Sequence, residues 1–134
     1  MIETIRLSDK ARTQLISLKR RTGITQWNVL CRWAFCLSLA EGSKPPNEEI
    51  PSDSSIEMSW RTFTGGHEDV YRAVLLQRAR RDDVPADPGA MQHYFRLHVH
   101  RGISYLITRD LDSIAALVGL ALAKRKGQHS REAA

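Results

Sequence analysis

The chain has 134 residues, of which 42% are hydrophobic, and a formal net charge of +5. A chain of this length can bury one core without disulfides or a metal, and this composition argues against wholesale disorder. No apolar run approaches the roughly 20 residues that cross a bilayer, and the N-terminus lacks the apolar segment of a signal peptide. We therefore expect a cytoplasmic protein with a single domain over residues 1–126.

The N-terminal third predicts a short strand followed by two helices. Residues 4–7 alternate in polarity and are β-prone, which favours a strand. Ser8 can cap a helix over 9–22 that ends at Gly23, and Thr25 can cap a second helix over 26–41. Ile24 and Val29 occupy the positions of a hydrophobic staple at the start of that second helix.

The second helix is apolar nearly all the way round, with only a narrow polar ridge. Such a helix must be buried on nearly all sides. In a chain this short we expect another copy of the protein to supply part of that burial. We therefore predict a homo-oligomer, with an interface that includes Trp27, Leu30, Trp33 and Leu37. Cys31 and Cys36 lie about 140° apart around the same helix, so we interpret both as small buried hydrophobic residues rather than as a bridge.

The remainder of the chain alternates loops and helices. A proline-rich loop is followed by a short alternating segment, and Gly65-Gly66 then interrupts the chain before the next helix. The predicted elements are a loop over 42–55, a short strand within 56–62, and helices over 67–81, 90–109 and 111–126, with a disordered tail over 127–134. The sequence thus predicts a mainly α fold, a compact helical bundle with one or two short strands.

Cations cluster at three of the predicted helix ends. Residues 1–40 hold seven cations and two acids, whereas 41–57 hold one cation and five acids, so the acids gather in a loop. Cations at a helix C-terminus complement the macrodipole, and each cluster alone is explained in that way. Three such clusters in a basic chain also fit contact with DNA phosphates. The clusters are Lys19, Arg20 and Arg21, then Arg78, Arg80 and Arg81, then Lys124, Arg125 and Lys126.

Catalytic and metal-binding patterns are not evident. The sequence has no phosphate-binding glycine loop, no HExxH and no nucleophile elbow. His98 falls on the apolar stripe of its predicted helix, while His93 and His100 share the opposite face two turns apart, which does not form a metal site without further ligands. We therefore predict a protein that is not an enzyme and holds no cofactor or metal.

The order strand, helix, helix also occurs in ribbon-helix-helix repressors. In those proteins, paired strands from two protomers enter the major groove and alternate strand residues contact bases. Thr4, Arg6 and Ser8 would then face the DNA. The further 80 or so residues argue against a simple repressor. A ribbon-helix-helix repressor that binds a specific sequence nevertheless stays open as an alternative.

Three stretches carry a resemblance to a known family: "RLSDKARTQLISLKRRTGITQWNVLCRWAFCLSL", "IEMSWRTFTGG" and "HVHRGISYL". They resemble the DndE proteins of bacterial DNA phosphorothioation systems, which replace a non-bridging phosphate oxygen of DNA with sulphur. The similarity covers about Ile5 to Lys126. It implies a small DNA-binding component without a recognised active site, a homotetramer, and a preference for nicked duplex. It also implies three kinds of partner: a cysteine desulphurase, an iron–sulphur protein and an ATPase.

We therefore expect sequence-independent contact with double-stranded DNA, in support of sulphur insertion by partner enzymes. One further alternative stays open, namely an assembly adaptor whose positive surface meets an acidic protein instead of DNA.

Overall fold

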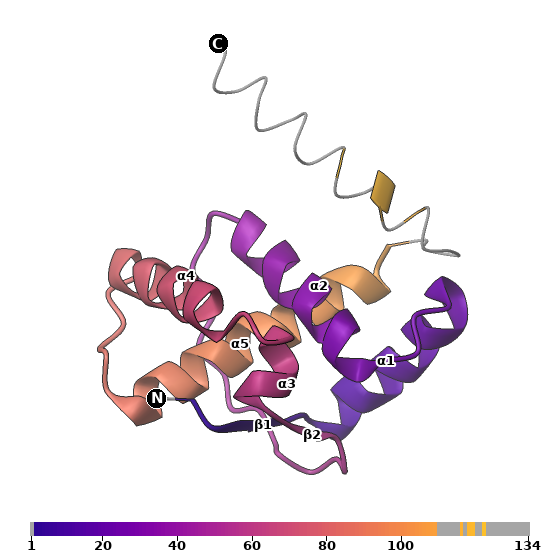
Figure 1. Cartoon of the computed structure of the whole chain (residues 1–134), viewed down its shortest axis with the longest axis horizontal. Coiled ribbons are helices and arrows are strands. Elements are labelled where there is room, and N and C mark those ends of the chain that lie inside the picture. The colour runs from indigo at the N-terminus through magenta and orange to yellow at the C-terminus, as the bar shows by residue number, and fades with distance from the viewer. Residues whose placement is uncertain (1, 110–115, 117, 120–121, 123–134) are drawn as a thin grey trace.

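The computed structural model describes residues 2–109, 116, 118–119 and 122. Helices α1, α2 and α4 lie around α5, and a short sheet lies to one side (Figure 1). This arrangement confirms the predicted mainly α fold with short strands. The elements, in chain order, are β1 (Thr4–Arg6), α1 (Asp9–Thr22), α2 (Trp27–Ala40), β2 (Glu57–Ser59), α3 (Trp60–Thr64), α4 (Glu68–Arg81) and α5 (Pro88–Ile107).

The predicted helix over 111–126 falls mostly outside the described residues, and the predicted tail over 127–134 falls entirely outside them. Four residues of this segment are described, and all four are helical: Ala116, Val118, Gly119 and Leu122. Within the described residues, no helix combines the length and the apolar character that a membrane span needs.

Helix α1 begins and ends as its sequence predicts. The Ser8 hydroxyl accepts a hydrogen bond from the Ala11 N–H, and Gly23 adopts a left-handed φ of 77° while donating its N–H to the Lys19 carbonyl. Helix α2 differs from the prediction at its start. Gln26, not Thr25, occupies the capping position, and its side chain makes no capping hydrogen bond. The first N–H groups of α2 therefore have no side-chain cap.

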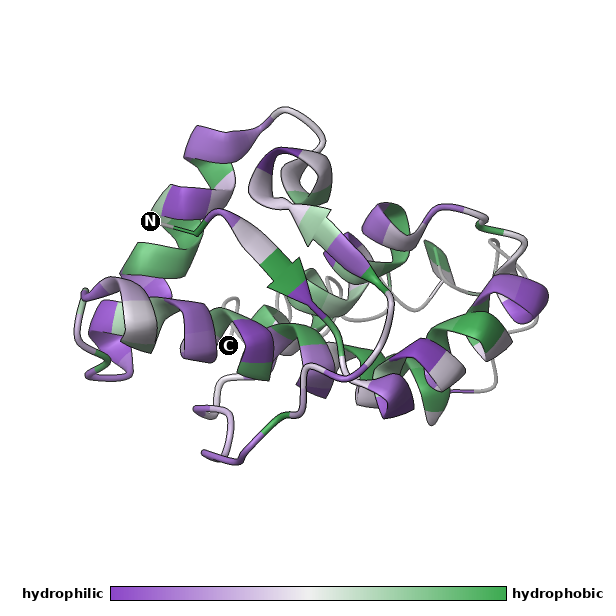
Figure 2. Cartoon of the chain, turned by 90° about the horizontal axis from the view of Figure 1, so that it is seen from below, coloured by the Kyte–Doolittle hydropathy of each residue, from purple (hydrophilic) through white to green (hydrophobic). Residues whose placement is uncertain are grey.

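The two strands form a small antiparallel sheet that lies in the foreground of Figure 2. Ile5 pairs with Met58, and both side chains are buried, while their neighbours along each strand are more exposed. This alternation lets one face of the sheet join the core and leaves the other to solvent.

The strand predicted within 56–62 is shorter than expected. The Ser59 hydroxyl accepts a hydrogen bond from the Thr62 N–H, which caps a helix instead of extending the strand. The resulting α3 ends at Gly65, which has a left-handed φ of 62°. The turn brings Trp60 and Phe63 to the core side, where their rings stack at 5.7 Å.

The environment of β1 argues against a ribbon-helix-helix dimer. One edge of β1 pairs with β2 of the same chain. At the other edge, the Gln92 side chain donates to the Thr4 carbonyl, and the Arg96 guanidinium donates to the Arg6 carbonyl. Both edges of the strand therefore have partners within one chain, and pairing with the strand of a second copy would break the contacts to α5.

The core centres on the crossing of α2 and α5. A Cβ atom at Gly102 would lie 1.7 Å from the Ala34 carbonyl oxygen, so only glycine allows the two backbones to approach this closely. Rings from three helices fill the space beside the crossing: Phe63 lies edge-on to both Phe35 and Phe95. This packing fixes the position of α2, whose two ends form the sites discussed below.

The position of α2 corrects part of the predicted oligomer interface. Leu30 is fully buried and Leu37 is 7% exposed within a single chain, so these two side chains belong to the chain's own core. Trp27 and Trp33 are half-buried and remain available to a partner. Cys36, which we expected to be buried, is exposed.

Candidate nucleic-acid interface

Three cations project from the last turn of α1: Lys19, Arg20 and Arg21, called here the α1 cluster. Leu18 and Thr22 carry the buried stripe of the helix through this turn, so the three residues between them fall outside it. Their charges lie where the α1 macrodipole is negative, as the sequence predicts.

The three side chains of the α1 cluster have different surroundings. Lys19 Nζ lies 3.8 Å from the centroid of the Trp27 ring, a cation–π contact. The Arg21 guanidinium donates a long hydrogen bond of 3.5 Å to the Ile107 carbonyl at the end of α5. Arg20 is exposed, and within the described part of the chain it makes no side-chain hydrogen bond or ion pair. Arg20 is therefore the member that is freest to meet a ligand.

A further cation, Arg12, lies near this cluster and was not among the predicted DNA contacts. It precedes Lys19 by seven residues, a spacing that places both on one side of α1. Arg12 and Trp27 both line a hollow of about 470 Å³ at the uncapped start of α2. The N-terminus of a helix carries a partial positive charge, so the start of α2 adds to the positive potential beside the α1 cluster. Glu57 on β2 contributes one opposing carboxylate to the same hollow.

The structure corrects the prediction for Arg78. Its side chain is only 7% exposed, and its Nε lies 3.3 Å from the carboxylate of Asp82. Its other nitrogens donate to backbone carbonyls in and after the last turn of α2, those of Leu39, Glu41 and Ser43, at 2.7, 2.6 and 3.0 Å. A phosphate could reach this guanidinium only by displacing these partners.

The reason for this arrangement lies at the C-terminus of α2, whose last carbonyls have no partner within the helix. Arg101 of α5 serves the same end, because its Nε donates to the Ser38 hydroxyl and a terminal nitrogen donates to the Ser38 carbonyl. Two arginines from different helices thus cap α2. Arg80 and Arg81 remain exposed, and Arg81 donates to the Gly42 carbonyl at 2.8 Å.

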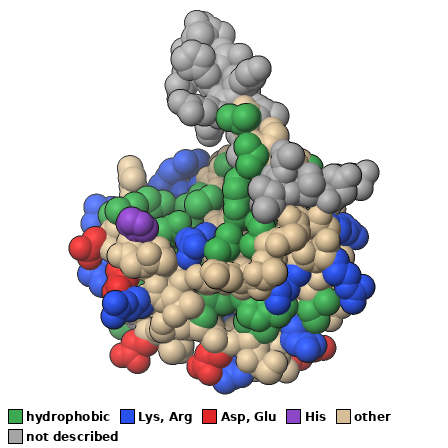
Figure 3. Space-filling view, turned by 45° about the vertical axis from the view of Figure 1, so that its right-hand side comes forward, with side chains coloured by type: hydrophobic (Ala, Val, Ile, Leu, Met, Phe, Trp, Pro, Cys, Tyr) green, Lys and Arg blue, Asp and Glu red, His purple; other side chains and the backbone are tan. Residues whose placement is uncertain are grey.

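Figure 3 shows one face of the molecule, on which Lys and Arg side chains stand in separate groups with hydrophobic and neutral side chains between them. The third predicted cluster, Lys124, Arg125 and Lys126, lies outside the described residues.

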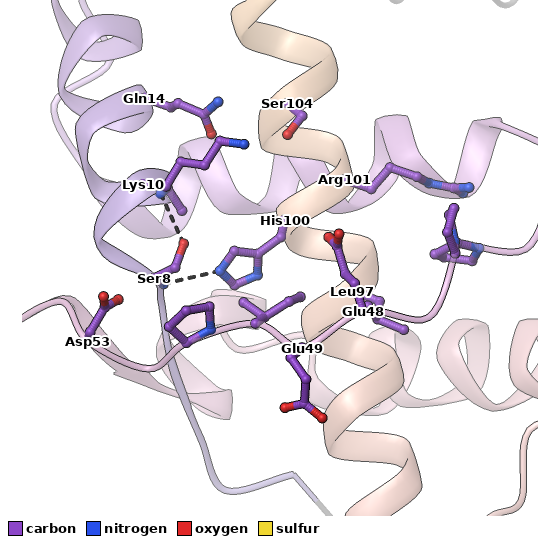
Figure 4. Close-up of a pocket in the computed structure, with 15 residues that line it drawn as sticks. Ser8, Lys10, Gln14, Glu48, Glu49, Asp53, Leu97, His100, Arg101 and Ser104 are labelled. Atoms are coloured by element: carbon purple, nitrogen blue, oxygen red, sulfur yellow. Dashed lines mark hydrogen bonds between the residues drawn. The ribbon is translucent and has the colours of Figure 1, made fainter.

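A second hollow, of about 410 Å³, lies between α1, α5 and the loop over 42–55 (Figure 4). Lys10 and Arg101 contribute positive charge, but the loop contributes three carboxylates, from Glu48, Glu49 and Asp53. This balance does not favour a polyanion, so the hollow is not part of the candidate interface.

Two histidines are held inside the fold. Burial lowers the pKa of His98 to about 3 and that of His100 to about 4, so both are neutral at pH 7. His100 Nε2 accepts the Ser8 N–H, and Nδ1 donates to the Arg96 carbonyl (Figure 4 shows the contact with Ser8). Across the described residues, no three His, Cys, Asp or Glu side chains come together in a group that could hold a metal ion.

Comparison with known proteins identifies the family. The family model described as DNA sulphur modification protein DndE matches residues 4–112. The chain belongs to the DndE family. DndE from Escherichia coli B7A, a protein involved in DNA phosphorothioation modification, has a crystal structure that is similar with a TM-score of 0.66 at 26% identity. That match covers 79% of this chain and 98% of the other.

A mutant DndE involved in DNA phosphorothioation has the same fold. Its crystal structure matches with a TM-score of 0.63 at 22% identity, over 81% of this chain and 100% of the other. No curated protein sequence gives a match.

Proposed function

We propose that this DndE-family protein is the DNA-binding component of a cytoplasmic DNA phosphorothioation machinery. It contacts the phosphate backbone of double-stranded DNA, largely independently of sequence, and partner enzymes insert the sulphur. The observation that carries this proposal is the exposed α1 cluster beside the start of α2. It is supported by family membership and by the intrachain partners on both edges of β1, which disfavour readout by a strand.

Assembly extends the proposed interface. The protein acts as a homotetramer, which repeats the α1 cluster four times and brings Arg80, Arg81 and Lys124–Lys126 towards the same duplex. The half-buried Trp33 and the exposed Cys36 on α2 provide surface for contacts between copies. Nicked duplex, which bends more readily than intact duplex, is the preferred substrate.

The first test removes the α1 cluster by changing Lys19, Arg20 and Arg21 to Gln. Each phosphate contact contributes about 0.9 to the slope of log affinity against log salt, so the slope should shrink by about 2 to 3. The affinity itself should fall at every salt concentration below about 0.2 M, and circular dichroism should show an intact fold.

A matched control changes three exposed cations elsewhere, Lys44, Arg61 and Arg72, to Gln, which alters the net charge equally. Its salt slope should stay within about 0.5 of the wild-type value. Equal losses in the two variants would show that only net charge matters and would remove the α1 cluster from the interface. Binding confined to one palindromic sequence would indicate a repressor, and no binding to intact or nicked duplex would indicate an adaptor.

A further inference from the structure

Four large hydrophobic side chains stand out as exposed in the described part of the chain, and they form two pairs. Val70 and Val74 on α4 are 60% and 39% exposed, and Val118 and Leu122 in the C-terminal segment are 43% and 54% exposed. The members of each pair are four residues apart, and residues at that spacing are neighbours on a helix surface. Each pair is thus an apolar stripe that faces solvent.

The two stripes do not cover each other within one chain, since all four side chains are exposed. Figure 1 also draws the described residues of the C-terminal segment well apart from α4. Beside the α4 stripe, Tyr71 packs against the buried Phe35 of α2, with ring centroids 6.1 Å apart, and lies near the exposed Cys36.

Most of the C-terminal segment lies beyond the part of the chain that the family model matches, which ends at residue 112. The two similar crystal structures are covered over 98% and 100% of their own length, while 79% and 81% of this chain is matched. Residues 114–123 read "IAALVGLALA", a run without a charge, and Lys124, Arg125 and Lys126 follow at once. An uncharged run of this kind needs a partner surface to bury it.

We propose that the C-terminal segment of one copy packs on α4 of a second copy in antiparallel orientation. Leu122 then lies against Val70, and Val118 lies against Val74. Charge decides the orientation. Running antiparallel, Lys124–Lys126 meet the acidic first turn of α4, whereas running parallel they would meet the basic last turn.

A reciprocal exchange between two copies covers all the exposed stripes with the same contact used twice, as a two-fold axis requires. This contact lies outside the α1 cluster. It shares only residues 124–126 with the proposed DNA interface, and the α1 cluster carries that interface without them. The tests of this contact need no DNA.

Disulfide trapping tests the contact directly in the full-length protein. In a Cys36→Ser background, copies carrying Leu122→Cys are mixed with copies carrying Val70→Cys, and separately with copies carrying Thr13→Cys on exposed α1 as the control. We expect a rapid cross-link between the two chains in the first mixture and a rate at least ten times lower in the control. Equal rates, no cross-link, or a bond that forms only when one chain carries both cysteines would overturn the proposal.

A charge exchange provides the second test and fixes the orientation. Changing Glu68 and Asp69 to Lys, or Lys124 and Lys126 to Glu, should each weaken self-association at least tenfold in sedimentation equilibrium at low salt. Combining the two double changes in one chain should restore association to within about threefold of the wild type. If the combined variant is as weak as either parent, the antiparallel contact is wrong.

Discussion

Both α1 and α4 end in three cations, the charge pattern that a helix macrodipole favours. In α1 the three side chains fall outside the buried stripe, so they remain at the surface. In α4 the buried stripe runs through Leu75, Arg78 and Ala79, and it carries Arg78 into the protein. The phase of the helix, rather than the presence of the cations, decides which of them can meet DNA and which one supports the fold.

The prediction with the largest expected effect places the same type of substitution, Arg to Leu, in both helices. Arg78→Leu should lower the free energy of unfolding by about 3–5 kcal/mol, because Asp82 loses its ion-pair partner and the carbonyls of Leu39, Glu41 and Ser43 lose their donor. Arg20→Leu should change it by less than about 0.5 kcal/mol, since Arg20 is exposed. Urea unfolding of both variants measures the difference.

The roles should reverse in DNA binding. Arg20→Leu should reduce the salt slope by about 0.9, which corresponds to one phosphate contact. A stable Arg78→Leu protein with a reduced salt slope would show instead that Arg78 leaves its buried position and binds phosphate.

The histidines of α5 extend the comparison, because burial again gives residues of one type different properties. The pKa of His100 is lowered to about 4 and that of His98 to about 3, whereas the unfolded chain takes up these protons near pH 6.5. The contribution of these two neutral histidines to the free energy of unfolding is therefore fully present above about pH 6.5. It is lost as the pH falls towards their pKa values in the folded protein. With two such groups the loss reaches at most about 2.7 kcal/mol per pH unit.

His100→Gln should remove about half of this pH dependence between pH 6 and 5, measured by urea unfolding and compared with the wild type at each pH. His93→Gln is the matched control on the same helix, since His93 hydrogen bonds to Asn47 at the protein surface. If the His100 variant and the control both show the same pH dependence as the wild type, buried His100 does not contribute to the pH dependence of stability.

Much of the fold follows from local sequence signals. The caps at Ser8 and Gly23 and the apolar stripes placed α1, α2, α4 and α5 to within a few residues. The errors arose where a tertiary partner decides the outcome. Ser59 ends a strand because Trp60 and Phe63 find a ring cluster to join, and both edges of β1 gain partners from β2 and α5, segments that are distant in the sequence.

The candidate site shows the same limit. The α1 cluster is evident from the sequence because it depends only on one helix and its phase. Arg78 could have been excluded by extending the stripe from Leu75, but its role at the end of α2 could not be foreseen, because the sequence does not show that these two helix ends meet. The proximity of Arg12 and Trp27 to Lys19 likewise requires the packing of α1 on α2.

The smallest expected effect separates charge from positioning within the α1 cluster. Lys19→Met removes a charge and should reduce the salt slope by about 0.9, while the loss of the cation–π contact should cost about 0.5–1 kcal/mol of stability. Trp27→Leu keeps the charge and releases the ammonium group from the ring, so the salt slope should stay unchanged while affinity falls less than threefold. Titrations of both variants at several salt concentrations, with oligomeric state checked by sedimentation, measure these effects. A reduced salt slope in Trp27→Leu would contradict this expectation. It would mean that the Lys19 ammonium group reaches the phosphate only when the Trp27 ring holds it in place.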